Sequence, residues 1–153
     1  MMNEVVPNRK EYDPRMHSAE HILNQTMVRL FHCGRAFSAH IEKKKSKCDY
    51  HFERNITVEE IVQIESMVND VIKANLPIQE KVLTREEAGK IVSLTRLPED
   101  AGENVRIIAI GDYDLCPCSG VHALRTSEIG DFKIISTDWT NGVLRIRYKI
   151  HGS

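Results

Sequence analysis

The sequence lacks any apolar run that approaches membrane-spanning length, and its first residues are polar, unlike those of a signal peptide. It is also poor in cysteine, with Cys33, Cys48, Cys116 and Cys118 as its only thiols. Four cysteines without a signal peptide argue against the disulfide framework of a small secreted protein. These absences predict a soluble, cytoplasmic protein that has no membrane partner.

An excess of charge of one sign is also missing, since the formal net charge at pH 7 is -1. Any nucleic acid would therefore have to bind a local patch. Two basic segments are present, Lys43, Lys44, Lys45 and Lys47 in one, and Arg145, Arg147 and Lys149 in the other. A lysine-rich turn can bind phosphates, but it is also typical of a solvated hairpin tip that protects a sheet edge.

The length predicts one domain. At 153 residues, 41% of them hydrophobic, the chain can bury a core but is too short for two comfortable domains. No internal repeat or low-complexity segment divides it. We therefore expect a single domain over residues 1–153.

Local signals place the main elements. Asp13 and Pro14 are typical of a helix N-cap and first position, which predicts a helix to about Phe31. Capping boxes at Thr57 and Thr84 predict a second long helix and a short third one. Strands are predicted at 36–41, 48–53, 78–83, 105–110, 131–136 and 143–150, with a loop at 97–102. Two long helices against a mostly antiparallel sheet make a two-layer α+β sandwich.

Histidine and cysteine gather in two short segments. His17 and His21 are one helical turn apart and share a helix face, away from the apolar stripe, so we expect them to face a cleft. Almost a hundred residues later comes Cys116-Pro117-Cys118-Ser119-Gly120-Val121-His122. Imidazole and thiolate are ligands that Zn²⁺ prefers. Either half alone also fits hydrogen-bonded histidines or a buried thiol, but together they predict a zinc site, in which Cys116 or Cys118 could be the thiolate.

The same residues resemble a known family. Residues 111–134 closely resemble the Cys-x-Gly-x-His, threonine, Glu-Ile-Gly and Phe-Lys-Ile pattern of the second additional domain of the alanyl and threonyl-tRNA synthetases. His17-Ser18-Ala19-Glu20-His21 is similar to the other metal-binding half of that domain. The resemblance covers about residues 14–150, which would be the core of the domain.

The resemblance implies a short editing protein of the AlaX type. Such a protein hydrolyses the ester between a wrong amino acid and its tRNA, usually serine and sometimes glycine on tRNA-Ala. The chain has no room for an aminoacylation domain, so it would act in trans on the acceptor end of released tRNA. No obligate protein partner is implied.

Carried over residue by residue, the resemblance also assigns a site. The zinc ligands would be His17, His21, Cys118 and His122, which selects Cys118 over Cys116. Candidate substrate-binding positions are Ala39, His40, Gly120 and Val121; Val121 replaces a usual threonine, and Ala39 and His40 lie nearest a glutamine of the alanine enzyme. Lys43, Lys44, Lys45 and Lys47 would contact the tRNA.

The chemistry expected of this site has one difficulty. Zinc can polarise a water or a carbonyl, but four protein ligands make the closed tetrahedron of a structural site. Glu20, one residue before His21, is a candidate general base, and a solvated, salt-bridged glutamate is the alternative.

Two other functions fit part of the pattern. His17, Glu20 and His21 also read as the His-x-x-Glu-His motif of inverted zinc metallopeptidases. A non-catalytic, zinc-stabilised RNA-binding module is a further alternative. A peptidase would tolerate loss of Cys118, whereas a deacylase would not.

Overall fold

The computed structural model describes residues 13–92 and 103–152, so the loop expected at 97–102 lies outside the described residues. The described residues form three α-helices: α1 (Pro14–Phe31), α2 (Val58–Lys73) and α3 (Arg85–Gly89). The strands are β1 (Ser38–His40), β2 (Ser46–His51), β3 (Ile78–Thr84), β4 (Asn104–Ile110), β5 (Asp114–Pro117), β6 (Asp131–Thr140) and β7 (Val143–His151). A short 3-10 helix, η2 (Thr126–Ile129), precedes β6.

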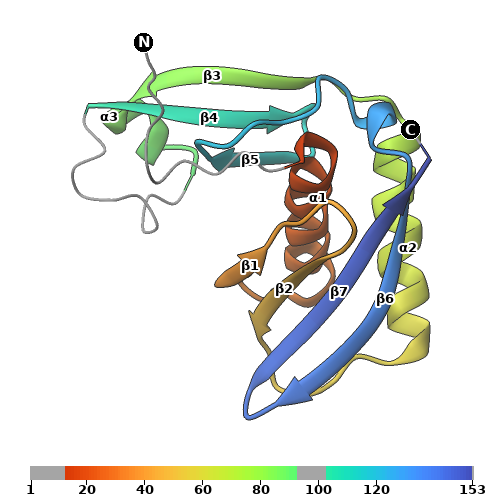
Figure 1. The fold of residues 1–153 in the computed structure, drawn as a ribbon. Helices are drawn as coiled ribbons and strands as arrows, with labels where there is room; N and C mark the ends of the chain where they lie inside the picture. Colours follow the sequence, from red (N-terminus) through yellow and green to blue (C-terminus); the bar gives the residue numbers. More distant parts are fainter. Residues whose placement is uncertain (1–12, 93–102, 153) are drawn as a thin grey trace.

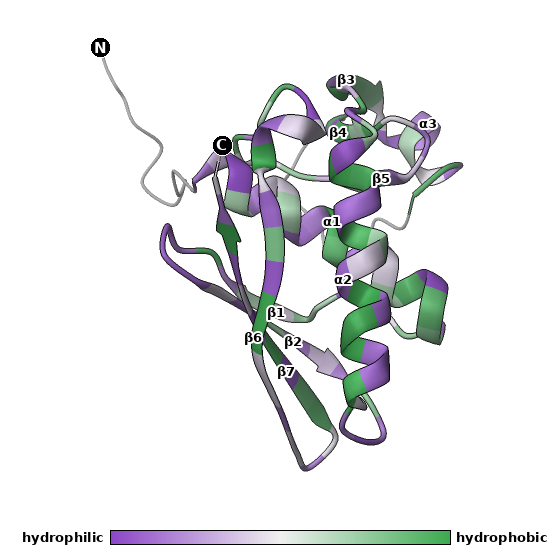
Figure 2. Ribbon diagram, turned by 90° about the vertical axis from the view of Figure 1, so that its right-hand side faces the viewer, coloured by the Kyte–Doolittle hydropathy of each residue, from purple (hydrophilic) through white to green (hydrophobic). Residues whose placement is uncertain are grey.

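The strands form two antiparallel sheets, one of four strands in the order β1-β2-β7-β6 and one of three in the order β3-β4-β5. The helices α1 and α2 lie side by side on one face of the four-stranded sheet (Figure 1, Figure 2). The α+β class and the antiparallel pairing are as expected. We expected a single sheet, however, and the described strands form two. Alternating hydrophobicity predicts that a segment is extended, but it does not identify the strand with which the segment pairs.

The first helix begins where the sequence predicts. The carboxylate of Asp13 accepts hydrogen bonds from the backbone N–H groups of Arg15 at 3.0 Å and Met16 at 3.1 Å. Pro14 follows at the first position, where a missing N–H costs nothing. At the other end, His32 has a left-handed backbone with φ 56° and donates its N–H to the carbonyl of Val28. These caps fix both ends of the helix that carries the histidine pair.

The main core lies between the two long helices and the four-stranded sheet. Ile22 and Leu23 of α1, Ile64 of α2, and Leu144 and Ile146 of β7 are completely buried. The predicted capping box of α2 is present, with Thr57 Oγ1 accepting from the N–H of Glu60 at 3.1 Å and Glu60 Oε1 accepting from the N–H of Thr57 at 2.8 Å.

Within the two described stretches, no helix combines the length and apolar character needed to cross a membrane.

One strand was not expected from the sequence. We predicted no strand between residues 110 and 131, but residues 114–117 form β5 and pair with β4, Cys116 lying opposite Ile108. This strand packs against α1. It therefore brings the cysteine and histidine segment that follows it close to the histidines of α1.

Candidate metal centre

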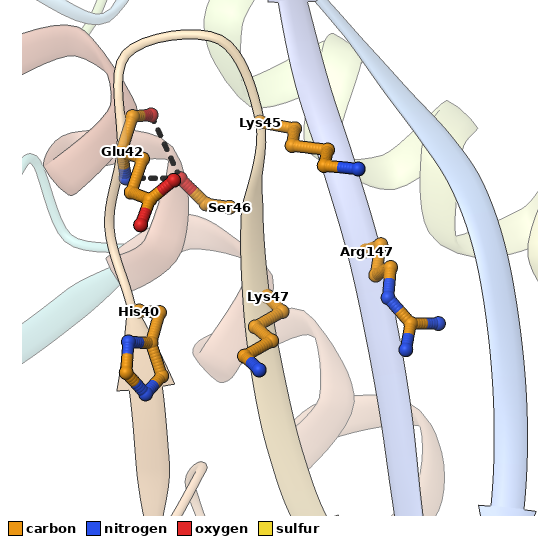
Figure 3. Close-up of a pocket in the computed structure, with 6 residues that line it drawn as sticks. All are labelled: His40, Glu42, Lys45, Ser46, Lys47 and Arg147. Carbon is orange, nitrogen blue, oxygen red and sulfur yellow. Dashed lines mark hydrogen bonds between the residues drawn. The ribbon is translucent and has the colours of Figure 1, made fainter.

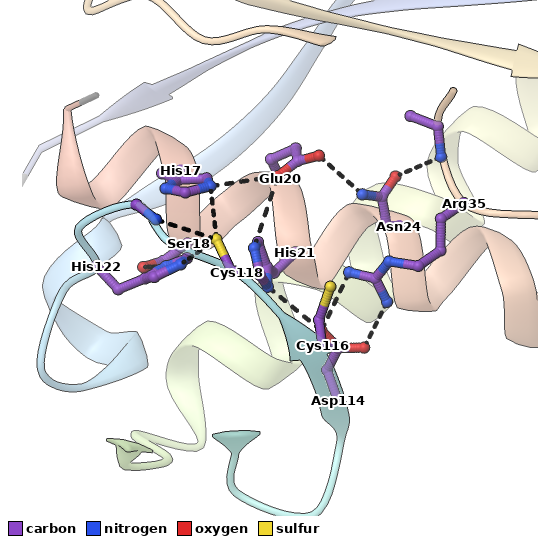
Figure 4. Close-up of polar contacts among 12 residues, drawn as sticks. His17, Ser18, Glu20, His21, Asn24, Arg35, Asp114, Cys116, Cys118 and His122 are labelled. Atoms are coloured by element: carbon purple, nitrogen blue, oxygen red, sulfur yellow. Dashed lines mark hydrogen bonds and ion pairs between the residues drawn. The ribbon is translucent and has the colours of Figure 1, made fainter. Parts of the chain in front are cut away.

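Four side chains from the two halves of the chain converge. His17 and His21 come from α1, whereas Cys118 and His122 come from the segment after β5 (Figure 4). One potential ligand atom from each residue lies within 4.8 Å of all the others. Cys118 Sγ is 3.5 Å from Nε2 of His17 and 3.5 Å from Nε2 of His122. Three imidazoles and one thiol at this spacing can hold a metal ion, as the sequence predicts.

In two of the histidines the outer ring nitrogen, Nδ1, which points away from Cys118, has a hydrogen-bond partner in the protein. His17 Nδ1 is 3.0 Å from the backbone carbonyl oxygen of Val121, and His122 Nδ1 is 3.0 Å from the hydroxyl of Ser18. A carbonyl oxygen only accepts, so Nδ1 of His17 is the donor of this hydrogen bond, and Nε2 faces the centre. Metal-binding histidines usually have such an outer hydrogen bond. The residues present therefore fit a metal ion such as zinc.

Two of the four donors, Cys118 and His122, have pKa values that suit a metal. Burial lowers the pKa of His21, but the Asp114 and Cys118 side chains outweigh burial and raise it well above its usual value. Burial raises the pKa of Cys118, but hydrogen bonds with His122, His17 and His21 outweigh it and lower the pKa to about 3. Burial lowers the pKa of His122 to about 4, although its hydrogen bond to Cys118 opposes the shift. At neutral pH Cys118 and His122 are therefore a thiolate and a neutral imidazole, the forms that bind metals. Burial raises the pKa of Cys116 instead, so Cys116 stays a thiol.

The histidines do not face an open cleft. His17 is 5% exposed and His21 3% exposed, and the segment that contains Gly120 and Val121 covers His17. A Cβ atom added at Gly120 would lie 2.3 Å from Cε1 of His17 and 2.7 Å from its Nδ1. The backbone at Gly120 thus approaches the imidazole more closely than any other residue would permit.

This contact leads to a prediction for Gly120→Ala. The new methyl group must displace the His17 ring, which should weaken zinc binding and destabilise the fold by about 1–3 kcal/mol, the usual cost of overpacking. Urea unfolding and a zinc competition titration measure the two effects. Gly34→Ala is the matched control, since a Cβ at Gly34 meets nothing within 4 Å. Equal zinc affinities for the two variants would contradict the prediction.

The carboxylate of Glu20 lies beside the four donors. Its Oε1 is 3.9 Å from Nε2 of both His17 and His21. Its other oxygen accepts a hydrogen bond from the Asn24 amide at 2.9 Å, and Asn24 Oδ1 in turn accepts from the Tyr50 hydroxyl at 2.7 Å. The side chain of Glu20 is only 14% exposed. It is thus held against the centre by a buried network.

The remaining candidate residues are divided between two places. Gly120 and Val121 lie at the metal centre, whereas Ala39 and His40 are exposed on β1, opposite Cys48 and Lys47 of β2. His40 borders a surface cavity of about 280 Å³ (Figure 3). The other residues that line this cavity, which we call the basic cavity, are Glu42, Lys45, Ser46, Lys47 and Arg147. Lys43 and Lys44 are exposed in the loop between β1 and β2.

Sequence reasoning missed the residues around the four donors. Ser18 contacts His122, and Asp114 lies 3.6 Å from His21 (Figure 4). Ser18 stands inside the histidine motif and Asp114 four residues before Cys118, so position next to the motifs was the available signal.

Comparisons with known proteins are consistent with this site. Residues 105–147, which include Cys118 and His122, match the family described as the threonyl and alanyl tRNA synthetase second additional domain. An alanine–tRNA ligase of Coxiella burnetii is 37% identical over 125 residues, which are 80% of this chain and 14% of the ligase. That of Idiomarina loihiensis is 34% identical over 147 residues, 94% of this chain and 17% of the ligase. The chain thus spans less than a fifth of the length of these curated relatives.

Proposed function

Because this chain belongs to the second additional domain family of the threonyl and alanyl tRNA synthetases, we propose that it hydrolyses the ester of mischarged aminoacyl-tRNA. The observation that carries the proposal is the convergence of His17, His21, Cys118 and His122 beside the carboxylate of Glu20. Residues 14–150 would form the one domain responsible. The expected substrate is serine on tRNA-Ala, with glycine on the same tRNA as the second choice.

In this proposal the four donors would hold Zn²⁺, which would fix the shape of the site. Four protein donors fill the positions of a tetrahedral zinc site, so the handling of the attacking water is assigned to a side chain. Glu20 supplies the carboxylate that lies beside the four donors. It would accept a proton from the water as the water oxygen bonds to the ester carbonyl carbon. The same proton would then pass to the ribose oxygen as its bond to the amino acid breaks.

Substrate recognition is assigned to two regions. Gly120 and Val121 would contact the amino acid, since they cover His17. Ala39 and His40, on β1, would contact the acceptor end of the tRNA.

The test is deacylation by the purified chain after its zinc content is measured. Substrates are serine-, glycine- and alanine-charged tRNA-Ala, with serine-charged tRNA-Thr alongside. We expect rapid loss of seryl-tRNA-Ala while alanyl-tRNA-Ala is spared. One zinc ion per chain with all four esters intact would overturn the proposal and favour the non-catalytic RNA-binding module.

The basic cavity is the proposed phosphate site. It joins Lys45 and Lys47 of the β1–β2 region to Arg147 of β7, and among the described residues that line it Glu42 is the only one with a carboxylate. Arg147 also pairs with Asp138 at 2.8 Å, so the two lysines carry most of the available charge. Such contacts bind the nucleic-acid backbone without reading its sequence.

We predict that Lys45→Ala and Lys47→Ala each weaken tRNA binding. Each lost phosphate contact should reduce the slope of log affinity against log salt by about 1. Binding measured across a salt series gives this slope. Lys81→Ala is the control, because Lys81 is exposed on β3 of the other sheet. If the Lys81 variant lost as much affinity as the other two, the cavity would not be the contact.

A further inference from the structure

Asp114 is the most deeply buried acidic side chain near the metal centre, with no exposed side-chain surface. Arg35 binds it through two hydrogen bonds, from Nη1 to Oδ1 at 2.7 Å and from Nη2 to Oδ2 at 3.2 Å. Gln25 donates a third hydrogen bond to Oδ1 at 2.8 Å. This donor set fixes the position of the carboxylate at the start of β5.

The fixed carboxylate faces His21. Its Oδ2 is 3.6 Å from Nδ1 of His21, on the side of the ring away from the cluster (Figure 4). Nδ1 is buried and makes no hydrogen bond with any described residue. Asp114 is therefore the acceptor that this nitrogen faces, at a distance slightly longer than a hydrogen bond.

The three histidines then follow one pattern. In His17 and His122 the outer Nδ1 is bonded to a protein oxygen, the carbonyl of Val121 and the hydroxyl of Ser18 respectively. In His21 the oxygen that Nδ1 faces belongs to a carboxylate, that of Asp114. A carboxylate that accepts the outer proton of a metal-binding histidine fixes its tautomer and makes the imidazole a stronger donor.

We propose that Asp114 is a positioning residue for His21, keeping the proton on Nδ1 and the lone pair of Nε2 directed to the metal. Arg35 and Gln25 hold the carboxylate in place. The inference rests on the metal site of the proposed function, although not on ester hydrolysis. The competing explanation is a purely structural ion pair, in which Asp114 only ties Arg35 to β5.

The experiment compares Asp114→Asn with Arg35→Gln in the full chain. Both variants break the ion pair, but only the first removes the carboxylate from His21. Zinc affinity is measured by competition with a chromogenic chelator, and the stability of the metal-free chain by urea unfolding. We expect Asp114→Asn to weaken zinc binding by about 10–100-fold. Arg35→Gln should lose similar stability while keeping most of the affinity.

A spectroscopic measurement on the unaltered chain covers the case in which Asp114→Asn fails to fold. Nitrogen-15 NMR of the zinc-loaded protein should show the His21 proton on Nδ1 and the metal on Nε2. A proton on Nε2 would overturn the inference. So would equal losses of zinc affinity in the two variants, since that is the result of a structural ion pair.

The outcomes for the inference and for the proposed function are separable. Zinc binding with the expected variant pattern but no deacylation would retain the role of Asp114 and reject the hydrolase. Deacylation with unchanged zinc affinity in Asp114→Asn would do the reverse. A chain that binds no zinc at all would overturn the inference.

Discussion

Replacing Cys118 with alanine should abolish stoichiometric zinc binding, whereas the same change at Cys116 should leave about one zinc ion per chain. Cys118 Sγ is 3.5 Å from two imidazole nitrogens, and its pKa is lowered to about 3. Cys116 has a raised pKa and donates its S–H to the carbonyl of Pro117 at 3.4 Å. Losing a ligand should lower the zinc affinity by more than the 10–100-fold that is typical when a residue that only hydrogen-bonds a ligand is lost.

Zinc quantified after dialysis, together with a competition titration, measures this difference. Deacylation should fall with the zinc in the Cys118 variant and persist in the Cys116 variant. Zinc loss in the Cys116 variant alone would move the thiolate ligand to Cys116. Peptide cleavage that survived the Cys118 change would instead support the inverted zinc metallopeptidase alternative.

Glu20→Gln should lower kcat for seryl-tRNA-Ala by about 10²–10⁴-fold, the range of a lost general base. Glutamine keeps the shape of the side chain and can still accept the hydrogen bond from Asn24, so zinc content should stay near that of the unaltered chain. KM should change little, because the carboxylate acts on the water and not on the bound tRNA. Single-turnover deacylation measures the chemical step directly.

Glu59→Gln serves as the matched control, since Glu59 is exposed in the first turn of α2. An unchanged kcat in Glu20→Gln would remove Glu20 from the mechanism. The vicinal hydroxyl of the tRNA terminal ribose would then be the remaining group able to activate the water. A loss of zinc in the same variant would make Glu20 part of the metal site.

Local features of this fold were predictable because they depend on neighbours in the sequence. The Asp13 cap and the Thr57 and Thr84 capping boxes each need residues within one helical turn. The division of the strands into two sheets was not predictable, since β4 could have paired with either group. The strand β5 was missed because its four residues carry too short a pattern to separate a strand from a loop.

In the candidate site, too, the features that depend on local sequence were predictable and those that depend on packing were not. The four donors were predictable from their spacing and from the family resemblance. The outer contacts of Val121 and Asp114 were not, because they depend on how β5 and its following segment pack on α1. The sequence likewise could not show that Arg147 of β7 lies beside Lys45 and Lys47, since this follows from the β2–β7 register.

The two halves of the metal centre have a thermodynamic consequence. His17 and Cys118 are 101 positions apart, so an ion bound by both is a crosslink that closes a ring of about a hundred residues. In the chain-entropy description, a permanent crosslink that closes a ring of this length raises the free energy of the unfolded state by about 4.7 kcal/mol. A reversible metal crosslink acts in the same direction only while it is occupied. The persistence of the folded chain would then follow the free zinc concentration around it.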